Sequence, residues 1–83
     1  MKLAYFASIR ERIGVAEETV SLPAGVTTVS DLLRWLECRG DNYYHALQPG
    51  ELVRVAIDHQ HVQQDTPIAG ATEIGFFPPM TGG

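Results

Sequence analysis

The sequence of 83 residues lacks the features that mark several large classes of protein. It contains one cysteine, Cys38, so it can form no internal disulfide, which fits a reducing compartment. Its longest apolar runs fall far short of the roughly 20 residues that span a bilayer, and its first residues do not form a signal-peptide pattern. We therefore expect a cytoplasmic domain with no membrane span.

Positive charge is also scarce. The chain has 6 Lys and Arg residues against 10 Asp and Glu residues, which gives a formal net charge of −4. No cluster of Lys or Arg is present to neutralise phosphates, so the sequence argues against nucleic-acid binding. With 45% apolar and 19% charged residues, the chain has the composition of one small folded domain with a real core.

Motifs for catalysis are missing too. Ser8, Ser21 and Ser30 have no evident histidine and carboxylate partners that would make a nucleophilic triad. No Gly-rich phosphate loop is present, because Gly25 and Gly40 stand where they would end or begin local structure. This inventory indicates no active site made of side chains.

Four side chains are candidates for metal or sulfur chemistry: Cys38, Asp58, His59 and His61. His59 and His61 share one face of a strand next to Asp58, but a zinc site usually needs at least three protein ligands, so we expect a solvated hairpin turn and no metal. Cys38 falls in the last turn of an expected helix, opposite its apolar stripe, where the helix dipole disfavours a thiolate. We expect Cys38 to be an unactivated surface thiol.

Hydrophobic patterning predicts an α+β fold. Strands are expected over 2–9, 17–22, 52–57, 61–63 and 73–77, with a loop over 10–15 and a first hairpin formed by the first two strands. This order fits a mixed sheet of about five strands with one main helix packed on one face.

The main helix has the clearest local signals. Thr28 is a good N-cap, and Asp31 three residues later can complete a capping box. One apolar stripe follows at helical spacing: Val29, Leu32, Leu33 and Leu36. Gly40 is expected as the left-handed C-cap residue, and 43–47 as one further helical turn.

The end of the sequence is its most distinctive part. Pro78 and Pro79 follow the last expected strand and should stop it, because proline has no N–H for the sheet ladder. We therefore expect a domain over 1–77 and an extended tail over 78–83. Gly82 and Gly83 carry no Cβ and can thread a narrow slot, which presents the carboxylate of Gly83 to a partner. The alternative is a frayed end without function.

Three segments together resemble the small, sulfur-carrying subunit of molybdopterin synthase, in the ubiquitin-like β-grasp superfamily. They are Tyr5-Phe6-Ala7-Ser8-Ile9-Arg10-Glu11, Val55-Ala56-Ile57-Asp58 followed by Val62, and Phe76-Phe77-Pro78-Pro79-Met80-Thr81-Gly82-Gly83. The resemblance covers essentially the whole chain. Two residues depart from the family pattern: Asp58 stands where asparagine is expected, and Met80 is bulkier than the usual small branched residue.

The resemblance implies a β-grasp fold and a role as sulfur carrier in molybdenum cofactor biosynthesis. An adenylating, E1-like enzyme would use ATP and Mg²⁺ to activate the carboxyl group of Gly83, and a sulfur donor protein would convert it to a thiocarboxylate. The tail residues Pro78, Pro79, Met80, Thr81 and Gly82 would then insert into the large synthase subunit. The active site would lie in that subunit, so this chain would be a non-catalytic member of a heteromeric complex and would bind no cofactor itself.

A partner needs a surface near the base of the tail. Phe6 and Phe77 are the apolar candidates, and Arg10 can pair with a carboxylate of the partner. The alternative is that both phenylalanines are core and Arg10 caps a local turn. Other functions also stay open at this point: a β-grasp carrier for another pathway such as thiamine synthesis, a ubiquitin-like protein modifier, or a plain interaction module.

Overall fold

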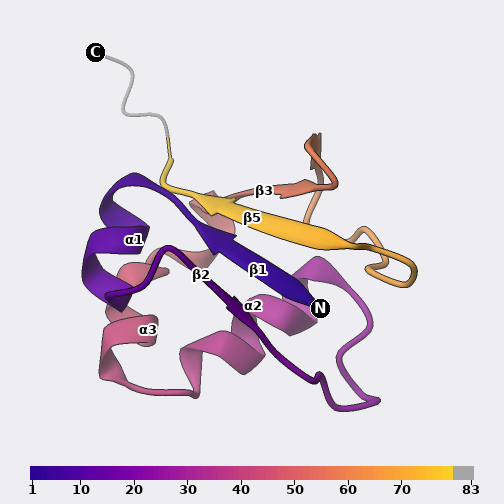
Figure 1. The fold of residues 1–83 in the computed structure, drawn as a ribbon, viewed down its shortest axis with the longest axis horizontal. Helices are drawn as coiled ribbons and strands as arrows, with labels where there is room; N and C mark the ends of the chain where they lie inside the picture. The colour runs from indigo at the N-terminus through magenta and orange to yellow at the C-terminus, as the bar shows by residue number, and fades with distance from the viewer. Residues whose placement is uncertain (80–83) are drawn as a thin grey trace.

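The computed structural model describes residues 1–79, and Met80, Thr81, Gly82 and Gly83 lie outside the described residues (Figure 1). Its elements, in chain order, are β1 (Lys2–Tyr5), α1 (Ala7–Ile13), β2 (Glu17–Thr19), α2 (Val29–Glu37), α3 (Asp41–Ala46), the 3-10 turn η1 (Gly50–Leu52), β3 (Arg54–Ile57), β4 (Gln60–Val62) and β5 (Glu73–Phe77). Within residues 1–79, no helix has the length and apolar character needed to cross a membrane.

The strands form one mixed sheet in the order β2-β1-β5-β3-β4. The two central strands, β1 and β5, run parallel, with Leu3 opposite Ile74 and Tyr5 opposite Phe76, and every other pair is antiparallel. The chain therefore starts and finishes its folded part on neighbouring strands (Figure 1). This arrangement matches the β-grasp fold that the family resemblance implies. The expected antiparallel pairing of the first two strands is confirmed, but α1 lies between them in place of a loop, so they do not form a simple hairpin.

The core lies between the sheet and the helices. Side chains alternate along the strands, so that one face of the sheet is buried. The largest fully buried side chains are Tyr5, Phe76, Leu3, Ile9, Leu32, Leu36, Leu47, Ile74, Val29 and Val55, and they come from β1, β3 and β5 and from α1, α2 and the end of α3. Burying each such side chain stabilises the fold by about 1.5–3 kcal/mol. Within residues 1–79, no helix covers the opposite face of the sheet (Figure 1).

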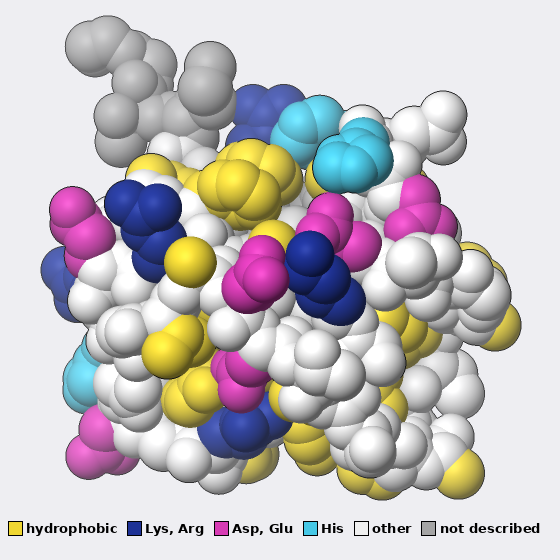
Figure 2. All heavy atoms as spheres, viewed as in Figure 1, with side chains coloured by type: hydrophobic (Ala, Val, Ile, Leu, Met, Phe, Trp, Pro, Cys, Tyr) yellow, Lys and Arg dark blue, Asp and Glu magenta, His cyan; other side chains and the backbone are white. Residues whose placement is uncertain are grey.

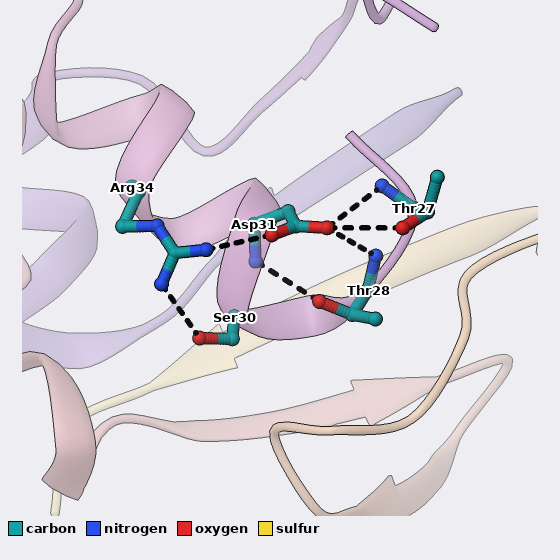
Figure 3. A network of polar contacts seen from close by, with 5 residues as sticks. All are labelled: Thr27, Thr28, Ser30, Asp31 and Arg34. Atoms are coloured by element: carbon teal, nitrogen blue, oxygen red, sulfur yellow. Dashed lines mark hydrogen bonds and ion pairs between the residues drawn. The ribbon is translucent and has the colours of Figure 1, made fainter. Parts of the chain in front are cut away.

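The main helix, α2, begins as predicted. Thr28 Oγ1 accepts a hydrogen bond from the Asp31 amide at 3.2 Å, and Asp31 Oδ2 accepts from the amides of Thr27 at 3.1 Å and Thr28 at 3.2 Å (Figure 3). Arg34 donates to Asp31 Oδ1 at 2.7 Å. The hydrogen bonds from Thr27 and then Thr28 lower the pKa of Asp31 to about 2, so this carboxylate is ionised wherever the protein is folded at ordinary pH.

The first strand is shorter than predicted, and a helix follows it. β1 ends at Tyr5, and α1 occupies Ala7–Ile13, where the end of a strand and part of a loop over 10–15 were expected. That prediction was wrong because apolar residues in a short run do not distinguish a strand from a buried helical turn. Ile9 and Ile13 are one helical turn apart, and both are buried in the core.

Glycine ends a different helix from the one predicted. Gly40 was expected as the left-handed C-cap of α2, but its φ of 163° is extended and it precedes α3. Cys38 is the C-cap of α2, with a right-handed conformation. The left-handed glycine is Gly14, whose φ of 99° ends α1 and whose amide donates to Arg10 O at 2.9 Å.

The remaining element bounds shift by a few residues. The expected strands over 17–22, 52–57 and 61–63 are found as Glu17–Thr19, Arg54–Ile57 and Gln60–Val62, the expected turn over 43–47 belongs to α3, and the last strand is found where it was predicted. The 3-10 turn at Gly50–Leu52 includes the residue at which the third strand was expected to begin. Element ends depend on packing more than on propensity, so this pattern of errors is expected.

Candidate functional site

An aromatic pair lies on the uncovered face of the sheet. The rings of Phe6 and Phe77 are stacked with centroids 4.3 Å apart and an interplanar angle of 4°. Phe6 is 40% exposed and Phe77 is half-buried, so the alternative that both are core side chains is wrong. Figure 2 shows a hydrophobic patch near the upper end of this face.

The strand register explains why these two rings meet. Ala4 lies opposite Gly75 in the parallel β1–β5 pair, and the Phe6 amide continues the ladder by donating to Phe76 O at 3.1 Å. Alternation then directs Phe6 and Phe77 to the same face of the sheet. A Cβ on Gly75 would lie 3.2 Å from Phe6 Cε2 and 3.3 Å from Phe77 Cε1. Glycine at this position therefore gives the two rings room to lie against the strand.

Histidines border the aromatic pair. The His61 ring centroid is 5.4 Å from that of Phe77, and His59 Nε2 lies 3.8 Å from Glu73 Oε1. With Phe6, these residues line a shallow cavity of about 140 Å³ on the open face. Among residues 1–79, no group of three or more His, Cys, Asp or Glu side chains is arranged to hold a metal ion.

Asp58 accepts hydrogen bonds from a distant part of the chain, and the sequence did not predict them. Asp58 and His59 have φ values of 48° and 73°, which is the left-handed pair of a tight hairpin turn between β3 and β4. The Asp58 carboxylate accepts hydrogen bonds from the amides of Thr72 at 3.0 Å and Glu73 at 2.8 Å. The predicted hairpin turn is confirmed. Through these hydrogen bonds, the Asp58 side chain connects the turn to the start of β5.

The remaining predicted site residues are placed as follows. Arg10 is exposed on α1, and its amide donates to Phe6 O at 3.3 Å, so its backbone is one helical turn from the aromatic pair. Pro78 and Pro79 are half-buried where the chain leaves β5. The predicted tail residues Met80, Thr81 and Gly82 and the predicted reactive residue Gly83 lie outside the described residues. Cys38 is exposed, as expected.

A second polar cluster joins β2 to the helices. The hydroxyl groups of Tyr5 and Tyr43 both donate to Glu18 Oε2 at 2.7 Å, and Arg39 donates to Glu18 Oε1 at 3.2 Å. Burial opposes ionisation of Glu18, but the hydrogen bonds from Tyr43 and Tyr5 and the charge of Arg39 together lower its pKa below the ordinary value. This cluster serves stability, because its carboxylate is already satisfied by three donors.

The fold and the exposed aromatic pair beside the exit of the chain from β5 define a ubiquitin-like β-grasp protein. The chain belongs to the ThiS family, whose family model matches residues 3–83.

Relatives of known role match over the full length. The chain is 32% identical to the molybdopterin synthase sulfur carrier subunit of Escherichia coli (strain K12) and 34% identical to that of Haemophilus influenzae, in each case over 100% of this chain and 99% of the relative. A solved structure of a protein from Pyrococcus furiosus is 30% identical with a TM-score of 0.71, and the match covers 94% of each chain.

Proposed function

We propose that this chain is the sulfur carrier subunit of a molybdopterin synthase and that its reactive group is the C-terminal carboxyl of Gly83. The observation that carries the proposal is the full-length similarity to two sulfur carrier subunits, which extends through the Phe-Phe-Pro-Pro-Met-Thr-Gly-Gly ending.

Adenylation makes the carboxyl group reactive. A carboxylate is a poor electrophile, because it is resonance-stabilised and its leaving group would be oxide. An E1-like enzyme with ATP and Mg²⁺ would form the acyl adenylate and release pyrophosphate. A persulfide on the sulfur donor protein would then displace AMP and form an acyl disulfide with Gly83. A thiol would cleave the S–S bond of this intermediate by exchange, which leaves a thiocarboxylate on Gly83 and a disulfide on the donor. The thiocarboxylate is anionic and nucleophilic without a local base, so this chain needs no cofactor of its own.

The aromatic pair is the docking surface for the large synthase subunit in this proposal. Phe6 and Phe77 expose a flat apolar surface directly beside Pro78, and exposed aromatic residues of this kind are enriched at interfaces. Arg10 can pair with a carboxylate at the edge of the same contact. Docking at Phe77 directs the residues that follow it, Pro78 to Gly82, into the large subunit, where sulfur would pass to the pterin precursor.

The proline pair lowers the cost of insertion. Ordering an extended segment costs about 1–2 kcal/mol per residue in backbone entropy. Proline restricts φ in the free chain as well as in the bound one, so Pro78 and Pro79 reduce the entropy that binding removes.

Intact-mass measurement tests the proposal directly. The chain is incubated with the E1-like enzyme of its own organism, ATP, Mg²⁺ and a sulfur donor. We expect a mass gain equal to the replacement of one oxygen by sulfur, and no gain for a variant that lacks Gly83. Isopeptide-linked adducts to lysines of other proteins would instead identify a protein modifier, and an unchanged mass with active enzymes would refute the carrier function.

A further inference from the structure

Half of the cationic side chains make no ion pair within the described residues. Lys2 pairs with Glu17 and Glu73, Arg34 with Asp31, and Arg39 with Glu18. The other three Lys and Arg residues, Arg10, Arg12 and Arg54, take part in no ion pair within residues 1–79. All three are exposed.

These three arginines surround the place where the chain leaves β5. Arg54 lies directly opposite Phe77 in the antiparallel β3–β5 pair. Arg10 lies one helical turn after Phe6, which is stacked on Phe77. Figure 2 shows Lys and Arg side chains to the left of the hydrophobic patch and above it. We refer to Arg10, Arg12 and Arg54 as the arginine collar.

Arg12 lies in a cleft next to the place where the chain leaves β5. It lines an open cavity of about 590 Å³ together with Pro78, Pro79 and His45, between α1, α3 and the end of β5. Among the described residues that line this cleft, none is acidic. Two exposed acidic residues lie in this region: Glu11 stands between Arg10 and Arg12 in the sequence, and Glu51 lines a cavity together with Arg54. Three positive charges therefore stand against two negative charges.

The sign of this region is opposite to that of the whole chain. The protein as a whole has a net charge of −4 and would repel an acidic partner. The three arginines that form no ion pair within residues 1–79 give this end of the domain a local positive charge. Unpaired, solvent-exposed guanidinium groups suit carboxylates, which they bind in a bidentate fork. The collar therefore fits a partner surface that is rich in Asp and Glu.

The length of the tail decides which part of the partner the collar meets. Residues 80–83 follow Pro79, and a fully extended segment of four residues spans at most about 14 Å. When the tail is inserted, the collar stays outside the slot with the folded domain. It can contact the rim of the slot, and it has no contact with the reacting atoms.

We propose that the arginine collar docks against an acidic rim around the tail slot of the large synthase subunit and steers the encounter between the two proteins. The inference rests on the proposed function, because it takes the large subunit as the partner. Charges of opposite sign around a docking site mainly raise the association rate, and salt screens this effect over about 10 Å at 0.1 M.

The experiment compares two variants with the same change in net charge. Arg12→Gln/Arg54→Gln removes two collar charges that the aromatic docking surface does not use, and the matched control Lys2→Gln/Arg34→Gln removes two charges elsewhere. Association with the large subunit is measured by stopped flow from about 20 mM to about 500 mM salt, a range over which screening becomes nearly complete. Circular dichroism verifies that both variants fold.

We expect the collar variant to associate about 10-fold more slowly than the wild-type chain at low salt, with the difference disappearing at high salt, and the control to stay within about twofold. Equal slowing of both variants, no slowing, or faster association of the collar variant would each overturn the inference while leaving the proposed function intact. Failure of the wild-type chain to bind the large subunit at any salt would refute both.

Discussion

At the scale of single residues, Phe6 and Phe77 stand apart from the other aromatic side chains of the sheet. Tyr5 and Phe76 are neighbours of this pair in sequence and are fully buried, while Phe6 keeps 40% of its surface exposed. The rings are stacked on each other on the open face. Such exposure is unfavourable for an isolated domain and favourable for one that binds a partner.

Replacing Phe6 tests whether this exposure serves binding. Phe6→Ala removes one ring of the stack, so we expect affinity for the large subunit to fall about 10-fold or more, as for an aromatic hot spot. Leu52→Ala is the matched control, because Leu52 is also a large exposed apolar residue, at 53%, but lies in η1. Isothermal titration calorimetry measures both. Equal losses for the two variants would show that the aromatic pair is not the docking surface.

Gly75 controls the geometry of the same pair. A Cβ at this position would already lie 3.2 Å from the Phe6 ring, and a valine adds two methyl groups. We expect Gly75→Val to displace both rings and weaken binding about as much as Phe6→Ala, while leaving the fold intact, since valine favours strands. Gly25→Val is the control, because a Cβ at Gly25 would have open space around it. Gly70 is unsuitable as a control position, because its φ of 81° would strain a valine. Unchanged affinity with a folded Gly75→Val protein would contradict this account.

At the scale of elements, α2 is specified by local signals. The capping box at Thr28 satisfies amides that have no partner inside the helix, and the apolar stripe faces the core. These signals lie within a few residues of one another, so they can be recognised before the fold is known. The start of α2 and its buried face were both predicted correctly for this reason.

The cap makes a measurable contribution to stability. Thr28→Ala removes the acceptor for the Asp31 amide, so we expect the free energy of unfolding to fall by about 1 kcal/mol. In a domain of this size, that change lowers the melting temperature by about 4–8 °C. Ser21→Ala, an exposed position outside any helix or strand, is the control and should melt like the wild-type chain. Calorimetry that shows no difference between the two variants would argue against the cap.

The α1 helix shows where local signals fail. Residues 2–9 form one apolar and aromatic run that favours a strand, yet the chain turns at Ala7, whose φ is 51°, and continues as a helix. The turn lets Ile9 and Ile13 reach the core and leaves Phe6 on the open face. The outcome depends on where the rest of the core has room for side chains, which the short run itself does not encode.

At the scale of the whole molecule, Glu18 joins parts of the chain that are distant in sequence. It binds Tyr5 of β1, Tyr43 of α3 and Arg39 beyond α2. Because these donors lower its pKa in the folded state, the ionised carboxylate stabilises the fold above the unfolded pKa of about 4.5. That stability is lost as the pH falls through the folded-state value. Asp31, whose pKa is about 2, adds a loss in the same direction.

We therefore expect stability to decrease on acidification from about pH 4.5 downward. Glu18→Gln should lower the free energy of unfolding at neutral pH by about 1–2 kcal/mol, because a neutral amide accepts weaker hydrogen bonds. The difference from the wild-type chain should narrow in acid, where Glu18 is itself protonated. Glu17→Gln, on the exposed side of β2, is the control. Urea unfolding across this pH range measures both; a difference that stays constant with pH would contradict the linkage.

The candidate site was only partly predictable. Phe6, Arg10, Phe77 and the proline pair were identified from the sequence, and the structure brings them to one end of the sheet. Arg54 and Arg12 were not identified, because nothing in their local sequence indicates that β3 places one opposite Phe77 and that α1 places the other beside Pro78. A charge that lacks a partner can be recognised only when all possible partners are in place.

The sequence by itself determined the last strand, the capped helix and the proline-glycine ending, because each depends on neighbours along the chain. Only the tertiary structure decided that 7–13 is a helix and that Phe6 is stacked on Phe77. It also decided that three arginines with no ion pair among residues 1–79 lie near the exit from β5. The physical reason is the parallel register of β1 with β5, which joins the two ends of the folded chain. The local sequence of neither strand is enough to specify that the two strands pair.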